Sequence, residues 1–408
     1  MTEASPQAEP GSASPTAAPP PGFAAAWVAL ALGQIVVWSS MFYGFAALLP
    51  RWEDAFAEAA GPPPSLGLSL ALGVSALLAP AVGRRIDLGQ GPRVMPAAAV
   101  LGALCLGAVS QSAGPWTFLA AWTVMGAAIA GCLYEPCFAL LTRARGPYAK
   151  RAIASVTLIA GFATAVAFPS VGALEAAFGW RGAAVGMAAA TALLGAPLLA
   201  FGAARIEAAA PPDPPRAAPP PRALAPLADP KVARIASAFA LGGLCHGMVS
   251  AHILALLAAR DVAPAQAAWV AASIGPMQVA GRIALLSAPA RWRAAGPAVS
   301  ALGCMAAGAL ILSLGLGALS AAAFAALFGA SIGAITILRP AVLAETAGTE
   351  GFGALAGAVA LPVMAAYAAA PAVGGALRAL GGADLALGVA VALPFVGALV
   401  LAPLLRRG

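Results

Sequence analysis

The chain has 408 residues, of which 61% are hydrophobic and 9% charged, and its formal net charge is +7. Soluble globular proteins carry about 25% charged residues, so this composition excludes an ordinary soluble fold. The apolar residues form long blocks that mostly reach the roughly 20 residues a helix needs to cross a bilayer. Because the short alternating stretches of a transmembrane barrel do not occur, the sequence predicts an all-α integral membrane protein.

Twelve apolar spans are predicted, in two groups of six. Residues 1–23 contain no Lys or Arg and are typical of a disordered cytoplasmic tail. Residues 204–230 form a proline-rich cytoplasmic linker between a first bundle, 24–203, and a second bundle, 231–408. The spans are 24–49, 65–83, 94–111, 116–142, 152–174, 182–203, 231–258, 264–287, 295–314, 317–343, 352–377 and 384–405.

The basic residues predict the topology. With the N-terminus placed in the cytoplasm, 16 of the 22 Lys and Arg residues fall in cytoplasmic segments and four in external ones. This bias predicts a multi-pass protein of a bacterial plasma (inner) membrane with both termini in the cytoplasm. Because the basic residues are spread over short loops, no nucleic-acid partner is expected.

The loop between the second and third spans reads GRRIDLGQGPR, residues 83–93. Gly83, Arg84, Asp87, Gly91 and Arg93 form a pattern that resembles the signature loop of the major facilitator superfamily of transporters. The resemblance implies two pseudo-symmetric six-helix bundles and a cytoplasmic latch made by Asp87 and nearby arginines. Charge-assisted hydrogen bonds of this kind break when bundles move, although the arginines also serve to set topology.

Short segments of the first bundle recur in the second, as expected for a duplicated transporter unit. PSVG at 169–172 matches PAVG at 371–374, and APLL at 196–199 matches APLL at 402–405. The repeat also pairs two residues that each stand before a proline in spans 4 and 10. Kinks are predicted at four prolines: Pro136, Pro340, Pro169 and Pro371.

The two residues that the repeat aligns before a proline are Glu135 in span 4 and Arg339 in span 10. A charge inside the membrane costs about 2.5–3.5 kcal/mol, so each needs a partner or a water-filled cavity. We expect the two to face each other across a central cavity, where they handle substrate or protons or act in gating. The alternative is an ion pair that only fixes the packing of the two bundles.

Span 8 contains SIGPMQVAGR, residues 273–282, which resembles helix 8 of the monocarboxylate-porter and oxalate–formate-exchanger branch. Arg282 matches an arginine that holds the anionic substrate there, and Gln278 replaces the aspartate that precedes it. The planar guanidinium suits a carboxylate. The alternative is that Arg282 snorkels to the cytoplasmic surface.

Further cavity residues follow from the superfamily resemblance, in which helices 1, 4, 7 and 10 line the cavity. They are Gln34, Trp38 and Tyr43 in span 1, Tyr134 in span 4 and His252 in span 7. Ordinary helix packing is the alternative for each. His246 and His252 are six residues apart and do not share a helix face, so no metal site is expected.

The sequence thus predicts a secondary active transporter for a small organic anion such as a monocarboxylate, with proton coupling left open. Efflux of drugs or metalloids is an alternative, although the arginine of drug antiporters is replaced by Trp122. A non-transporting membrane sensor is the alternative from another class. No phosphate-binding motif or His-Glu-x-x-His motif occurs, so no enzyme and no cofactor are expected. A monomer is expected.

Overall fold

The computed structural model describes residues 23–145, 149–210, 225–287, 293–348 and 352–406, and every regular element among them is a helix. The first bundle contains the elements up to residue 207. They are α1 (Phe23–Trp38), η1 (Ser39–Tyr43), α2 (Gly44–Ala55), α3 (Leu66–Asp87), α4 (Gly91–Ser110), α5 (Pro115–Cys132), α6 (Tyr134–Arg145), α7 (Ala149–Ala160), α8 (Ala163–Ala190), η3 (Thr191–Gly195) and α9 (Ala196–Glu207).

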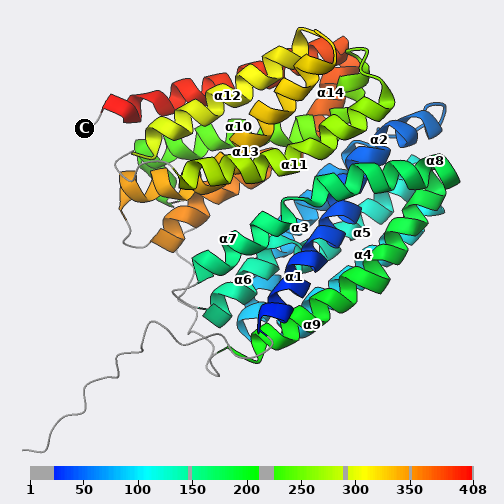
Figure 1. Cartoon of the computed structure of the whole chain (residues 1–408), viewed down its shortest axis with the longest axis horizontal. Coiled ribbons are helices and arrows are strands. Elements are labelled where there is room, and N and C mark those ends of the chain that lie inside the picture. The colour runs from blue at the N-terminus through cyan, green and yellow to red at the C-terminus, as the bar shows by residue number, and fades with distance from the viewer. Residues whose placement is uncertain (1–22, 146–148, 211–224, 288–292, 349–351, 407–408) are drawn as a thin grey trace, which may run out of the picture.

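The second bundle lies beside the first (Figure 1). Its elements are η4 (Ala225–Ala228), α10 (Pro230–Ala258), α11 (Pro264–Leu286), α12 (Ala295–Ser313), α13 (Ala318–Ala347), α14 (Phe352–Leu401) and η5 (Ala402–Arg406). The described chain begins and ends at the same end of the molecule, which we call the terminal end. The other end is called the opposite end.

Nine helical segments of the described chain are long and apolar enough to cross a membrane. Two of them, Ala152–Glu207 and Leu355–Leu405, run for 56 and 51 residues. Each changes direction at a glycine with a positive φ, Gly179 (+68°) or Gly382 (+66°), where other residues would be strained. Each therefore supplies two crossings. Together with α11, this arrangement is consistent with the twelve predicted spans.

Small residues let the helices of the second bundle pack backbone against backbone. An added Cβ at Gly333 on α13 would overlap the carbonyl of Gln278 on α11, and one at Gly281 would overlap the carbonyl of Ala330. At Gly329 it would lie 2.6 Å from a carbonyl oxygen of α11. Close approach of this kind is how membrane helices gain packing energy without a hydrophobic driving force. The close approach at Gly333 also holds the backbone of Gln278 in place within the bundle.

The two bundles touch mainly through three helix pairs: α8 with α11, α3 with α14, and α2 with α10. At the α8–α11 contact, Thr164 Oγ1 donates to the carbonyl of Ala272 at 2.8 Å and accepts from Gly275 N at 2.9 Å. Nearer the opposite end, Ser69 on α3 accepts from the amide of Ala372 on α14 at 3.0 Å. These contacts lie in the middle and at the opposite end, so the molecule is closed there.

Candidate functional site

Span 4 is broken in its middle. α5 ends at Cys132, Leu133 has an extended backbone (ψ −151°), and α6 begins at Tyr134. Pro136 has no backbone N–H, so the carbonyl of Cys132 lacks its helical donor. Gln34 Nε2 donates to that carbonyl at 2.8 Å. Gln34 is fully buried, and it supports the break instead of lining the cavity as the sequence predicted.

The break places Glu135 in the first turn of α6. A helix N-terminus carries a partial positive charge, which stabilises a carboxylate. Glu135 is also exposed, although it lies in the middle of a predicted span. The side chain therefore faces an open space between the bundles, and the helix end and the solvent there both offset the cost of its charge.

Arg339 approaches the same space from the second bundle. It is half-buried and lies on the continuous helix α13. The charges of Arg339 and Glu135 lie within electrostatic range of each other. No ion pair within the described residues joins them, however. In this conformation the two side chains lie near each other without direct contact.

Aromatic rings from both bundles surround these charges. The ring centroids of Trp38 and Tyr134 lie 4.6 Å apart. Phe42 stacks on Tyr367 of the second bundle, with centroids 6.0 Å apart and planes 5° from parallel. Tyr134 and Tyr367 both lie within electrostatic range of Glu135. Titratable side chains and aromatic faces from both bundles thus lie close together here.

A second guanidinium joins the site from α11. Tyr43 lies within hydrogen-bonding reach of Gln278 and within electrostatic range of Arg282. Arg282 is 7% exposed, and its Nη1 donates to the backbone carbonyl of Thr157 on α7 at 2.8 Å. The side chain therefore reaches across to the first bundle, which is not the geometry of snorkelling. Its buried Nε has no partner among the described residues, so one donor of the guanidinium is left unused.

If Arg282 binds an anionic substrate as the sequence predicts, replacing it by lysine should weaken transport at a normal level of expression. A lysine offers a point charge and cannot donate to Thr157 while presenting a second donor in the same plane. We expect the apparent affinity in a flux assay to fall, while Arg205→Lys, at an exposed position on α9, leaves it unchanged. Equal affinities of the Arg282→Lys variant and the parent protein would contradict this role.

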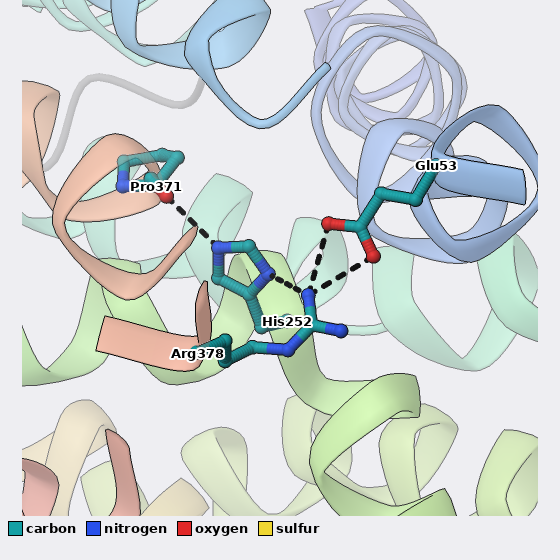
Figure 2. A network of polar contacts seen from close by, with 4 residues as sticks. All are labelled: Glu53, His252, Pro371 and Arg378. Carbon is teal, nitrogen blue, oxygen red and sulfur yellow. Dashed lines mark hydrogen bonds and ion pairs between the residues drawn. The ribbon is translucent and has the colours of Figure 1, made fainter. Parts of the chain in front are cut away.

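A polar cluster closes the opposite end (Figure 2). Arg378 Nη1 on α14 donates to the two carboxylate oxygens of Glu53 on α2, at 2.9 and 3.0 Å. The same nitrogen lies 3.0 Å from Nδ1 of His252 on α10, whose Nε2 lies 2.8 Å from the carbonyl oxygen of Pro371. His252 therefore belongs to the closed end and not to the central cavity. The sequence analysis singled out neither Glu53 nor Arg378.

No family model matches the sequence, and no curated protein matches it. Solved structures do. The chain is similar to a variant of the nucleoside transporter NupG, with a TM-score of 0.73 and 12% identity over 94% of this chain and 100% of that one. The human organic anion transporter MFSD10 (TETRAN) has a TM-score of 0.64 and 17% identity over 94% of this chain and 100% of that one.

A bacterial homologue of the human lysosomal transporter Spinster, solved in an inward-facing and unoccupied conformation, has a TM-score of 0.62 and 14% identity, covering 95% of this chain and 96% of that one. All three are transporters of the same architecture, and each alignment spans both bundles. This chain has the major facilitator fold.

The signature loop of the major facilitator fold is held here by its own bundle. Arg143 Nη1 donates to the backbone carbonyl of Asp87 at 2.9 Å, and its Nε pairs with Glu207 at 2.8 Å. Gly89 turns the loop with a φ of +78°. Arg84 and Arg93 are exposed. The sequence predicted the loop but missed Arg143 and Glu207, which stand at the ends of spans 4 and 6.

The prolines behave differently from one another in the major facilitator fold of this chain. Only Pro136 stands beside a helix break, while the helical backbone continues through Pro169, Pro340 and Pro371. The changes of direction in α8 and α14 occur at glycines, as described above. The kinks predicted at these four prolines do not require a break, because a helix can bend around a missing hydrogen bond without ending.

Proposed function

We propose that the chain is a secondary active transporter that moves a small organic anion across the plasma membrane by alternating access. The observation that carries this proposal is the charge of the central cavity. The site contains two guanidinium groups and one carboxylate within electrostatic range of one another or of the same tyrosine. They are Arg282, Arg339 and Glu135. The surplus of positive charge favours an anion, and a guanidinium is the side chain best suited to a carboxylate.

The aromatic rings support a substrate with a flat organic portion. Aromatic faces stack offset or edge-on with planar groups and contribute about 0.5–1.5 kcal/mol beyond the burial of area. Trp38, Tyr134 and Tyr367 offer such faces beside the charges. A monocarboxylate with a planar or unsaturated body fits both features, whereas an inorganic anion would leave the rings unused.

The closed opposite end and the separated charges support alternating access. If the basic residues set the topology as predicted, the terminal end is cytoplasmic and this conformation faces inward. In the alternate conformation the bundles would separate at Glu53 and Arg378 and meet near the signature loop. Glu135 is the exposed acid of the cavity and therefore the group we assign to proton coupling.

Efflux of cationic drugs has less support. Trp122, which occupies the position of the antiporter arginine, is fully buried. Its ring lies 4.6 Å from Phe45 and 5.9 Å from Trp52, measured between centroids. The position is part of an aromatic core and holds no charge that could serve an antiporter.

The test is a ligand screen followed by a flux measurement. Purified protein is heated in the presence of aromatic and aliphatic carboxylates, nucleosides, cationic drugs and metalloid oxyanions. We expect carboxylates to raise the unfolding temperature, since a ligand of the native state stabilises it by mass action. Proteoliposomes then take up the best carboxylate, with and without a pH gradient. Binding without flux would favour a sensor, and stabilisation by cations alone would contradict the anion proposal.

The topology has its own test. A cysteine placed at Ala218 lies in the linker, outside the described residues, and we expect it to be cytoplasmic because of the bias of basic residues. An impermeant maleimide should therefore fail to label Ala218→Cys in intact cells and should label it after lysis. Efficient labelling in intact cells that still transport would contradict the predicted orientation.

A further inference from the structure

The cluster at the opposite end joins α2, α10 and α14 (Figure 2). His252 on α10 is 2% exposed and lies between Arg378 and the Pro371 carbonyl, both of α14. Gly374 makes room for the ring, because an added Cβ there would lie 2.6 Å from His252 Cδ2. Arg378 in turn pairs with Glu53 on α2. The imidazole thus holds the arginine whose ion pair with Glu53 joins the two bundles.

The partners of the ring determine its protonation state. A guanidinium only donates hydrogen bonds, and a carbonyl oxygen only accepts them. Nδ1 of His252 must therefore accept from Arg378, while Nε2 carries the hydrogen and donates to Pro371. The closed cluster accommodates only the neutral imidazole with its hydrogen on Nε2. An imidazolium would direct an N–H at Nδ1 against an N–H of Arg378.

The charged surroundings reinforce this requirement. Arg378 on α14 is the charged group that faces the ring directly, and Glu53 on α2 lies beyond it. Just before α3, the hydroxyl of Ser65 lies close to Gly375, and it carries no charge. Among the described residues, no carboxylate contacts the imidazole itself. A second positive charge on the ring would be repelled by Arg378 without an acid of its own to balance it.

We propose that His252 is a proton-binding site that keeps the opposite end closed only while it is unprotonated. When a proton from the adjoining solution binds, an N–H bond forms at Nδ1 and the hydrogen bond from Arg378 is lost. The bundles then separate at this end. The inference rests on the alternating access proposed above, and it places a proton-sensitive step of the cycle outside the substrate cavity, in the gate itself.

The test measures the opening of this end without any substrate. Spin labels are attached at Ala57→Cys and Leu380→Cys, which are exposed near Glu53 and Arg378 on opposite bundles. Cys304 is replaced by alanine, because it is the one exposed cysteine and the other four are buried. Pulsed electron paramagnetic resonance gives the distribution of distances between the labels at about pH 5 and about pH 8, the range over which imidazoles commonly titrate.

At about pH 5 we expect the ratio of long to short distances to rise at least about tenfold over its value at pH 8. This change corresponds to the loss of one hydrogen bond to a charged group. In His252→Gln the amide oxygen can accept from Arg378 and the amide nitrogen can donate to Pro371, so the end should stay closed at both pH values. His246→Gln is the matched control, because His246 lies on the same helix but contacts Phe328 and Tyr367.

A third variant provides the distances between the labels when this end is open. Glu53→Gln removes the ion pair and should give long distances already at pH 8. If His252→Gln does not fold, His252→Asn replaces it in the same comparison. A distribution that does not change with pH, or a response that persists in the amide variant, overturns the proposal. Because no substrate is added, failure to find an anion substrate would count against the proposed function and not against this gate.

Discussion

Replacing Glu135 by glutamine should lower flux by more than about tenfold while leaving the protein folded. The residue is exposed in the cavity and stands at a helix end, so its charge is not needed to hold a packed interface. A glutamine keeps the size and polarity of the side chain but cannot bind and release a proton, a function that is commonly worth about 10²–10⁴-fold in rate when it is required. The measurement is uptake into proteoliposomes of the carboxylate identified in the ligand screen.

Arg339→Gln should also reduce flux, through affinity. A hydrogen bond to a charged group contributes about 1.5–3 kcal/mol, which corresponds to roughly 10–100-fold in binding. Glu58→Gln, at an exposed position beyond α2, removes an acid without touching the cavity and serves as the control. Wild-type flux in either Glu135→Gln or Arg339→Gln would refute a functional role for that charge.

The exchange of both charges separates transport from packing. Glu135→Arg combined with Arg339→Glu preserves the net charge of the cavity. The exchange nevertheless places a cation at the N-terminus of α6, where the helix dipole favours an anion. We expect the exchanged protein to fold and not to transport. Restored flux would mean that the two residues act only as a structural pair.

Gly333→Val should cause the largest loss of stability among single substitutions in the second bundle. The added Cβ would overlap the backbone carbonyl of Gln278, and backbone cannot move aside as a flexible side chain can. Overpacking costs about 1–3 kcal/mol and sometimes more, and a clash with backbone belongs at the upper end. We expect little monodisperse protein after extraction and a clearly lower unfolding temperature for what remains.

Gly303→Val on the neighbouring helix α12 is the matched control. A Cβ at Gly303 meets no atom within 4 Å, so the same change of residue should be tolerated. Equal yields and unfolding temperatures for the two variants would show that α11 and α13 can separate without cost. Close backbone packing would then not be what orders Gln278 and Arg282.

The fold could be predicted because membrane constraints leave little choice. Long apolar blocks must form helices, and Arg143 and Arg293 are typical of the basic residues that mark the ends of spans. Glu135 stood out because a carboxylate before a proline is anomalous inside an apolar run. Glu53 and Arg378 did not, because a charged residue at the end of a span is ordinary. Their pairing depends on how two bundles meet, which no local pattern records.

Contacts between distant helices were the other part that the sequence could not supply. Gln34 gave the same signal as a cavity residue, a polar side chain in an apolar helix, but it binds a carbonyl 98 residues away. Arg282 resembled either a substrate residue or a snorkelling one, and its Nη1 contacts the carbonyl of Thr157. In both cases the residue type was informative. Its partner was a backbone carbonyl, however, and every residue has one, so the sequence does not identify it.

The contact between α8 and α11 has a mechanical consequence. Pro276 lacks the N–H that would bind the carbonyl of Ala272, and Thr164 of the other bundle occupies that carbonyl. Beside it, an added Cβ at Gly275 would overlap the carbonyl of Gly161, so the two backbones are in close contact there. Such a contact can serve as the pivot for a rigid-body rotation of the two bundles, because close backbone packing opposes sliding of α8 along α11. Under the alternating access proposed above, a small separation at the Arg378 end would be matched by an approach at the far end, so that one movement opens one end and closes the other.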